Sequence, residues 1–265
     1  MNSDLRSDLT KVYEALKAEV VNYRFRPGEQ IRIAELADHL RVSSTPVREA
    51  LIRLEAEGLL DVAPRRGFFA KTLDLNEMID FVRYRFFLLK SAVEVADFGG
   101  TEGCSAPLAP DDAPTRAGGP MSAGDHAPRV HAGQAIWFET MMTRVASLSQ
   151  NRAVVHAIRN VNDRTHYVRA IDLERSDVIV ATRHSIERLW RSLQRADIAE
   201  AVAALEHDRD GQIERLPTVI KEGLSRACTP TALFAPMVPL SPPRIWTGAA
   251  AASRPLACAL MTARR

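Results

Sequence analysis

The chain has 265 residues and a formal net charge of +2, with 46% hydrophobic and 26% charged residues. This composition is ordinary for a soluble globular protein of one large or two modest domains, and the balanced charge neither demands nor excludes a nucleic-acid partner. No apolar run approaches the ~18 residues of a membrane span, and the polar N-terminus lacks the apolar region of a signal peptide. The three cysteines share no metal-ligand spacing, so we expect a reducing, cytoplasmic location.

The N-terminal part of the chain predicts three helices. Residues 6–23 carry apolar side chains at three- and four-residue steps, and a Pro-Gly pair ends that segment. A short helix is expected over residues 33–40. A third is expected over residues 44–57, with an apolar inner face formed by Val47, Leu51 and Leu54.

A β-hairpin is predicted after the third helix. Gly58 is the expected C-terminal cap, and LLDVAP, RRG and FFAKTL are typical of a strand, a tight turn and a second strand. Gly67 lets the turn adopt a positive φ. Three helices and a two-stranded wing make a winged helix-turn-helix, which we assign to residues 1–75.

The remainder of the chain is predicted to be an all-α bundle over residues 76–226, so the fold class is mainly α. Helices are expected over residues 76–97, 133–149, 152–171, 176–195 and 197–225. Two segments lack any hydrophobic period. Residues 98–132 are rich in Gly, Pro and Ala, and the tail, residues 227–265, is rich in Pro. Both are typical of loops or disorder.

The third helix has the features of a DNA recognition helix. The major groove admits one α-helix, whose first turn meets the base edges. With Ser43 as the N-cap, Ser44, Thr45 and Arg48 lie on or near this turn and have no core role. The free amide groups of a helix N-terminus also favour a phosphate. We therefore predict a double-stranded DNA operator as partner.

The stretch PGEQIRIAELADHLRVSSTPVREALIRLEAEGLLDVAPRRGFFA, residues 27–70, closely resembles the DNA-binding domain of the GntR family of bacterial transcription regulators. The shared pattern runs in order through Pro-Gly-Glu, Leu-Ala, Val-Ser, Thr-Pro-Val-Arg-Glu-Ala-Leu and a wing with Arg-Gly. One departure is Ser44, where the family usually has an arginine. Loss of a guanidinium there predicts weaker affinity or a different preferred operator.

The resemblance implies roles for the exposed residues of this domain. Arg48 would reach a guanine or a phosphate, and Ser44 and Thr45 would contact phosphate or a base edge. Arg66, carried by Gly67 at the wing tip, would approach the minor groove or its phosphates.

Each arginine also has a structural alternative. Arg48 could pair with Glu49 or Glu55 on a solvated face, and Arg66 could be an ordinary turn arginine. Arg32, near the start of the second helix, is a phosphate candidate for which both interpretations stay open.

The helical half resembles the FCD ligand-binding domain of the FadR-like subfamily. The resemblance rests on residues 80–96, residues 148–174 and residues 195–226, and the match is poor between residues 98 and 147. It implies that a small carboxylate metabolite binds inside the bundle, and that the bundle supplies most of the contact in a homodimer.

Many members of that subfamily hold a divalent metal through one Asp and three His, and such ligands suit Zn, Ni or Mn. Here the Asp-x-x-x-His pattern is absent, and His207, His184 and Glu139 are the nearest candidates. Three interpretations stay open: a complete site, a partial site with His184, His207 and either Glu139 or His156, and no metal, which we prefer.

Arg85 lies on the first helix of the bundle and is a candidate for effector binding, because a guanidinium forks onto a carboxylate. The alternative, which we prefer, is a salt bridge with Glu94 or with another helix.

The composition of residues 98–132 is that of a GC-rich gene translated out of frame, and the tail is similar. We hypothesise that one or two frame changes interrupt an otherwise regular regulator, because family-like segments lie on both sides of an aperiodic one. Reading the gene in its other two frames tests this hypothesis.

Together these observations predict a DNA-binding transcription regulator, a homodimeric repressor released by a small organic acid, and not an enzyme. One alternative is a degraded regulator that binds DNA without sensing. Another is a metal-dependent enzyme, for which the sequence shows no nucleophile elbow, phosphate loop or H-E-x-x-H motif.

Overall fold

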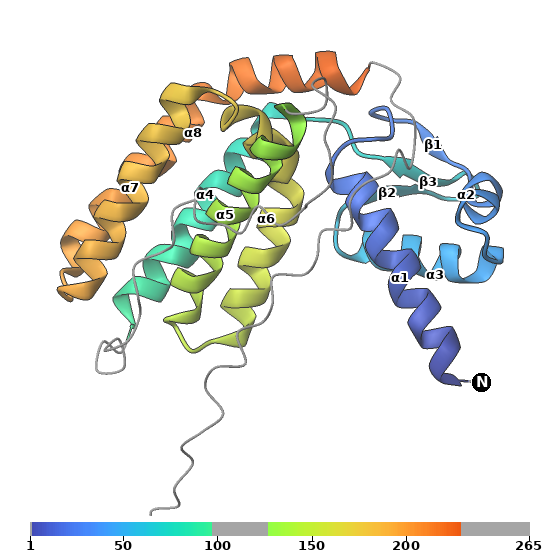
Figure 1. Ribbon diagram of the computed structural model, residues 1–265, viewed down its shortest axis with the longest axis horizontal. Coiled ribbons are helices and arrows are strands. Elements are labelled where there is room, and N and C mark those ends of the chain that lie inside the picture. The colour runs from blue at the N-terminus through green and yellow to red at the C-terminus, as the bar shows by residue number, and fades with distance from the viewer. Residues whose placement is uncertain (1, 97–126, 229–265) are drawn as a thin grey trace, which may run out of the picture. The chain divides into compact units, whose positions relative to one another are not determined.

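The computed structural model describes residues 2–96 and 127–228 (Figure 1). The fold is mainly α, with a winged helix-turn-helix followed by a helical part, as predicted. The elements in chain order are α1 (Asn2–Val21), β1 (Gln30–Ile31), α2 (Ile33–Leu40), α3 (Ser44–Ala56), β2 (Leu60–Ala63), β3 (Gly67–Ala70), α4 (Leu75–Glu94), α5 (Ala127–Ser147), α6 (Arg152–Asp172), α7 (Ser176–Gln194) and α8 (Ile198–Ala227).

Helix α3 is held by its apolar face. The side chains of Val47, Leu51 and Leu54 are completely buried, and α3 packs against α1, α2 and β2. On α1, Val12 and Leu16 contribute to the same buried core. The residues that pack therefore all lie on the back of α3, which leaves its N-terminal turn available.

The wing is a three-stranded antiparallel sheet of order β1-β3-β2. Leu60 pairs with Ala70 and Ala63 with Gly67. Strand β1 was not predicted, because two residues are too short to show a period-two pattern. The predicted positive φ at Gly67 is confirmed at +97°, and Arg65 in the same turn also has a positive φ, +64°.

The helical part encloses two clusters of buried apolar side chains. Helices α4, α5 and α6 lie side by side (Figure 1), and α8 packs against α4, α6 and α7. The largest completely buried side chains of this part come from α4, α5 and α6 and include Phe138, Leu89, Met142, Ile158 and Val93. Pro217 lies inside α8, where it removes one internal hydrogen bond of the helix.

Side-chain caps fix three of the bundle helices. The carboxylate of Asp74 accepts a hydrogen bond from the amide of Glu77 at the start of α4. Asn151 caps α6 in the same way. Asp197 caps α8 by accepting from the amide of Glu200. Such caps satisfy amide groups that the first turn of a helix leaves unpaired.

The segment predicted to be aperiodic is helical at its end. Helix α5 begins at Ala127, so the prediction was wrong for residues 127–132. A mixture of small and polar residues can form a helix without an apolar stripe. Residues 97–126 and 229–265 lie outside the described residues. The hypothesis of frame changes concerns mainly these residues and stays a hypothesis. The domain bounds at residues 75 and 226 stay predictions.

Within the described ranges, none of the helices combines the length and the apolar character that crossing a bilayer requires.

Candidate functional site

The N-terminal turn of α3 is exposed and uncommitted. Ser43 is the N-cap in an extended conformation, yet its side chain makes no capping hydrogen bond. Ser44 and Thr45 are exposed beside it. The hydroxyl groups of this turn and the unpaired amide groups of the helix end are therefore available to a phosphate or a base edge.

Arg48 extends from the same turn into solvent. In the part of the chain that the structure describes it forms no ion pair, so the alternative pairing with Glu49 or Glu55 is not formed. Further along α3, Arg53 is by contrast occupied, because its guanidinium lies 3.7 Å from the centre of the Tyr13 ring and its Nε donates to Glu57 over 3.3 Å. Arg48 is thus a free cation at the leading edge of α3.

The wing presents a second basic position. Arg66 is exposed, with its guanidinium 5.3 Å from the centre of the Phe69 ring, and its carbonyl accepts a hydrogen bond from the Gln30 side chain. Arg65 is equally exposed at the tip of the turn, a position that the sequence did not mark. Arg32 pairs with Glu35 over 2.9 Å in an exposed contact, which makes it a less available phosphate ligand.

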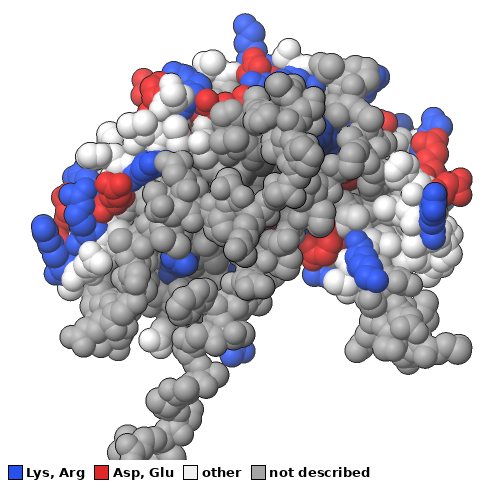
Figure 2. Space-filling model, viewed as in Figure 1, with Lys and Arg blue, Asp and Glu red and all other residues white. Residues whose placement is uncertain are grey.

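Charges of both signs share the visible surface. Figure 2 shows Lys and Arg interspersed with Asp and Glu over the described residues of the face it draws. The described residues of this face therefore do not form a uniformly basic patch.

A polar cluster lies inside the helical bundle. Arg85 of α4 is only 2% exposed. Its Nη2 donates to Oε1 of Gln212 and lies 3.9 Å from the Asp208 carboxylate on α8. Burial, and after it the charge of Arg169, lower the pKa of Arg85 to about 9, so the guanidinium remains charged at neutral pH. The predicted salt bridge to another helix is present with Asp208, at the long distance of 3.9 Å. Glu94, the other predicted partner, pairs with Lys90.

Glu139 of α5 binds two residues of α6. Its Oε1 accepts from Nη1 of Arg169 over 2.6 Å and lies 2.9 Å from Nδ1 of His166. Burial alone would raise the pKa of Glu139, but the charges and hydrogen bonds of His166 and Arg169 outweigh it and lower the pKa. Arg169 also donates to Thr165 over 2.6 Å, so it is fixed at two points.

A small cavity opens next to these arginines. Its volume is about 30 Å³, and its polar lining consists of Arg85, Thr165, Arg169, Asp172 and Gln212. Nη1 of Arg85 and Nε of Arg169 are buried and, among the described residues, have no hydrogen-bond acceptor. Both arginines that carry an unused donor therefore line one cavity.

The predicted metal residues have unlike surroundings. Glu139 is engaged as above, whereas His184, His207 and His156 are exposed. The described ranges hold no group of three or more His, Cys, Asp or Glu side chains placed to bind a metal ion. The donors do not fit a divalent cation, because Arg169 already occupies the Glu139 oxygen and two buried guanidinium charges lie nearby. The metal site stays a prediction that this core does not favour.

Helix α6 also contacts the winged helix-turn-helix. Asp163 pairs with Lys17 of α1 over 2.6 Å, and Asn160 donates to the carbonyl of Glu57 at the end of α3 over 2.7 Å. The Tyr167 ring stacks on Tyr23, with ring centres 4.9 Å apart. We call this set of contacts the junction.

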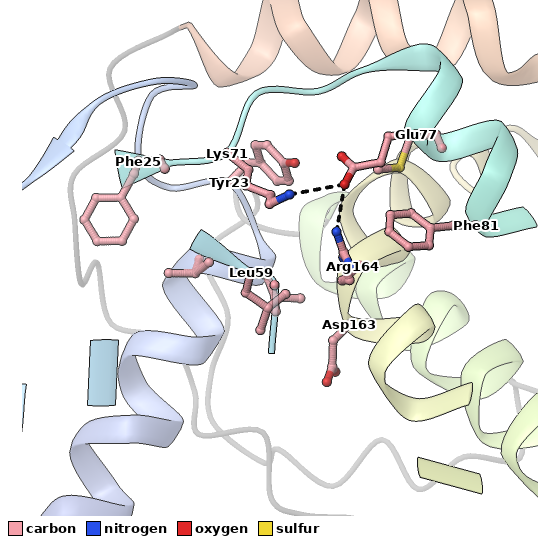
Figure 3. A pocket seen from close by; sticks show the side chains of 13 residues that line it. Tyr23, Phe25, Leu59, Lys71, Glu77, Phe81, Asp163 and Arg164 are labelled. Carbon is pink, nitrogen blue, oxygen red and sulfur yellow. Dashed lines mark hydrogen bonds and ion pairs between the residues drawn. The ribbon is translucent and has the colours of Figure 1, made fainter. Parts of the chain in front are cut away.

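The centre of the junction is Arg164. Figure 3 shows its guanidinium pointing to Glu77, which Lys71 binds from the other side; the two distances are 2.7 and 3.2 Å. The guanidinium also lies 4.1 Å from the centre of the Phe81 ring. A Cβ atom on Gly58 would lie only 3.0 Å from Nη1 of Arg164. Arg164 thus fills the space that this glycine leaves.

Comparison with known proteins identifies the family. The model of the bacterial regulatory proteins of the gntR family matches residues 9–70. The Nta operon transcriptional regulator of Aminobacter aminovorans is 38% identical over 153 residues, which cover 57% of this chain and 69% of that protein. This chain belongs to the GntR family of bacterial regulatory proteins.

Two further similarities extend over most of the GntR-family chain. The uncharacterised HTH-type transcriptional regulator YdhC of Bacillus subtilis is 27% identical over 224 residues, 80% of this chain and 92% of that protein. The structure of a transcriptional regulator GntR from Rhodococcus sp. RHA1 has the same fold, with a TM-score of 0.62, 17% identity, and coverage of 80% of this chain and 98% of that one. The chain is accordingly a DNA-binding transcription regulator and not an enzyme.

Sequence reasoning missed most of the bundle cluster of this GntR-family protein. It singled out Arg85 and Glu139 but not Arg169, whose burial depends on the packing of α5 against α6. A signal was present, because Asn162, Thr165, His166 and Arg169 recur at three- and four-residue steps and form a polar stripe on one face of a helix.

Proposed function

We propose that this GntR-family regulator is a repressor that binds a palindromic operator as a homodimer and is released by a small organic acid. The observation that carries the DNA-binding part is the exposed N-terminal turn of α3, where Arg48 is free of ion pairs among the described residues and the hydroxyl groups of Ser43, Ser44 and Thr45 are exposed. In this proposal α3 enters the major groove, and Arg66 approaches the DNA backbone from the wing.

Selection of bound DNA from a random pool tests this part. We expect enrichment of two inverted half-sites whose centres are separated by about one helical turn of DNA or a multiple of it, because a two-fold dimer presents two recognition helices. Failure of any sequence to be enriched at low ionic strength would contradict specific operator binding.

Support for a homodimer comes from α4. Tyr84 and Phe87 are large apolar side chains that are 47% and 65% exposed and lie three residues apart on one side of the helix, and Val95 at the C-cap is 63% exposed. Exposed apolar surface that recurs along one face is typical of a protein–protein interface. A second copy of this chain is the partner that the proposed palindromic operator would require.

Support for an acidic effector comes from the bundle core. Arg85 is buried, lines a cavity and has one guanidinium nitrogen without a hydrogen-bond acceptor among the described residues. These features suit a residue that binds the carboxylate of a ligand. Helix α6 offers the route to the DNA-binding domain. One face carries Asn160, Asp163, Arg164 and Tyr167 at the junction, and the opposite face carries Thr165, His166 and Arg169 in the core.

A gel-retardation titration with organic acids separates this proposal from a regulator that binds DNA without sensing. We expect one acid class to reduce operator affinity at constant pH and ionic strength. If no acid changes the affinity and none binds in calorimetry, the chain is a regulator without a sensor.

A further inference from the structure

We infer that the bundle core holds the carboxylate of its ligand directly between the guanidinium groups of Arg85 and Arg169, without a metal ion. This inference rests on the proposed sensing of an organic acid and names the residues and the chemistry that would do it. It departs from the divalent-metal site that the resemblance to the FCD domain implies.

The first argument is the charge in the core. Arg85 and Arg169 are 2% and 7% exposed. Glu139 neutralises Arg169 at 2.6 Å, but Arg85 has only a neutral amide, that of Gln212, as a hydrogen-bond partner. Asp208 lies 3.9 Å from Arg85 and already accepts from Gln212 over 2.7 Å. Arg85 is therefore a buried cation whose charge is incompletely balanced.

The second argument is the pair of unused donors. Nη1 of Arg85 and Nε of Arg169 are both buried, and neither has an acceptor within the described part of the protein. Leaving such donors unpaired costs free energy that a ligand acceptor would recover. A carboxylate offers two acceptor oxygens in one plane, which matches two guanidinium donors.

The third argument is a cavity that both residues line. Both arginines line the cavity of about 30 Å³. A cavity needs ~10–15 Å³ to hold one water molecule, so this cavity has room for the two oxygens of a carboxylate group. Val82, Val168 and Leu216 supply an apolar wall for a short carbon chain. The acidic residue of the lining, Asp172, is neutralised by Arg215, which donates to both of its carboxylate oxygens.

A divalent cation would meet the opposite conditions. The carboxylate best placed to bind it, Glu139, accepts from Arg169 and contacts His166. Two positive charges would repel the metal in a core of low dielectric constant. In this inference the two guanidinium groups supply the positive charge that a metal ion would otherwise present to the ligand carboxylate.

The test uses the full chain and acetate as the probe, with acetamide as its uncharged isostere. Binding is measured by calorimetry at constant pH and ionic strength, once with EDTA and once with added ZnCl₂. We expect acetate to bind equally under both conditions, and acetamide not to bind. Arg85→Gln and Arg169→Gln should each weaken acetate binding by roughly tenfold or more, whereas Arg191→Gln, an exposed charge on α7, should not.

Loss of acetate binding in EDTA, or stoichiometric zinc binding that tightens it, would overturn the inference. So would the absence of acetate binding up to millimolar concentrations. Operator binding of the same preparation, measured by gel retardation, shows independently whether the DNA-binding part of the proposed function holds. If the arginine variants fail to fold, the comparison of EDTA with zinc on the unaltered chain still decides.

Discussion

Arg48 and Arg53 stand on the same helix and have different surroundings. Arg53 lies over the Tyr13 ring and binds Glu57, so its charge is used inside the DNA-binding domain. Arg48 is exposed at the leading turn. Of these two arginines, the one at the first turn of α3 has no ion-pair partner among the described residues, and the one further along the helix is engaged by its own domain.

We predict that Arg48→Ala weakens operator binding by about 1–3 kcal/mol and relaxes discrimination at one base position. The reason is the loss of a bidentate donor to guanine or of a phosphate contact. Fluorescence anisotropy with the selected operator and single-base variants measures both effects. Arg191→Ala removes the same charge from α7 and serves as the control. Equal behaviour of the two variants would assign Arg48 to a solvated face.

Glu139 gives a prediction that depends on pH. Glu139→Gln leaves the buried Arg169 charge without its counter-ion, so we expect a loss of about 3 kcal/mol of stability at pH 7. The folded pKa of Glu139 is below its ordinary value of 4.5. Its contribution to stability is therefore complete above pH 4.5 and is lost as the pH falls through the folded pKa.

Denaturant unfolding of both proteins as the pH is lowered from 7 to below 4.5 checks this prediction. The difference in unfolding free energy should shrink as the native carboxylate becomes protonated. A difference that stays constant over this range would show that Glu139 is not stabilised in its charged form.

At the scale of elements, the junction between Gly58 and α6 allows a matched experiment. Gly58 and Gly28 have nearly equal φ, +74° and +77°, but a Cβ at Gly28 meets no atom within 4 Å, whereas one at Gly58 meets Arg164 at 3.0 Å. Alanine at either position has the same backbone cost, about 1–2 kcal/mol. Any excess cost at Gly58 measures the contact with α6.

We predict that Gly58→Ala destabilises the protein more than Gly28→Ala, and that the excess disappears in an Arg164→Ala background. Denaturant unfolding of the two single variants, the Arg164→Ala variant and the two double variants supplies the data. Equal losses at the two glycines in the parent protein would mean that Arg164 yields freely and that the junction is not packed there.

The elements of the fold were largely predictable, and the reasons differ along the chain. Helix α3 carries a clear stripe of Val47, Leu51 and Leu54, and the Gly67 turn marks the wing. Strand β1 was not predicted, because two residues are too few to show an alternating pattern. The start of α5 was not predicted, because the small residues there show no apolar stripe of helical spacing.

The site was predictable on the DNA side and less so in the bundle. Residues exposed at a helix end can be recognised from one sequence, since their role is local. The pairing of Arg85 with Gln212 joins residues 127 positions apart, and only the packing of α4 on α8 brings them together. Arg169 was missed for the same reason, as its partner Glu139 belongs to another helix.

At the scale of the whole molecule, dimerisation should be separable from folding. We predict that Phe87→Asp converts the protein to a monomer and weakens operator binding, because a charge is placed in the apolar face of α4. Val180→Asp is the control, since Val180 on α7 is exposed to a similar degree, 67% against 65%. Sedimentation equilibrium measures the mass of each variant. If both variants remain dimers, the interface lies elsewhere.

Helix α6 has one more implication, which follows from its two occupied faces. If a ligand in the core lowers the affinity for DNA through α6, thermodynamic reciprocity requires that DNA lower the affinity for the ligand by the same factor. Regulator molecules seated on their operators would then respond only at higher metabolite levels than molecules free in solution. A cell with many such molecules and few operators would hold two populations with different thresholds for the same signal.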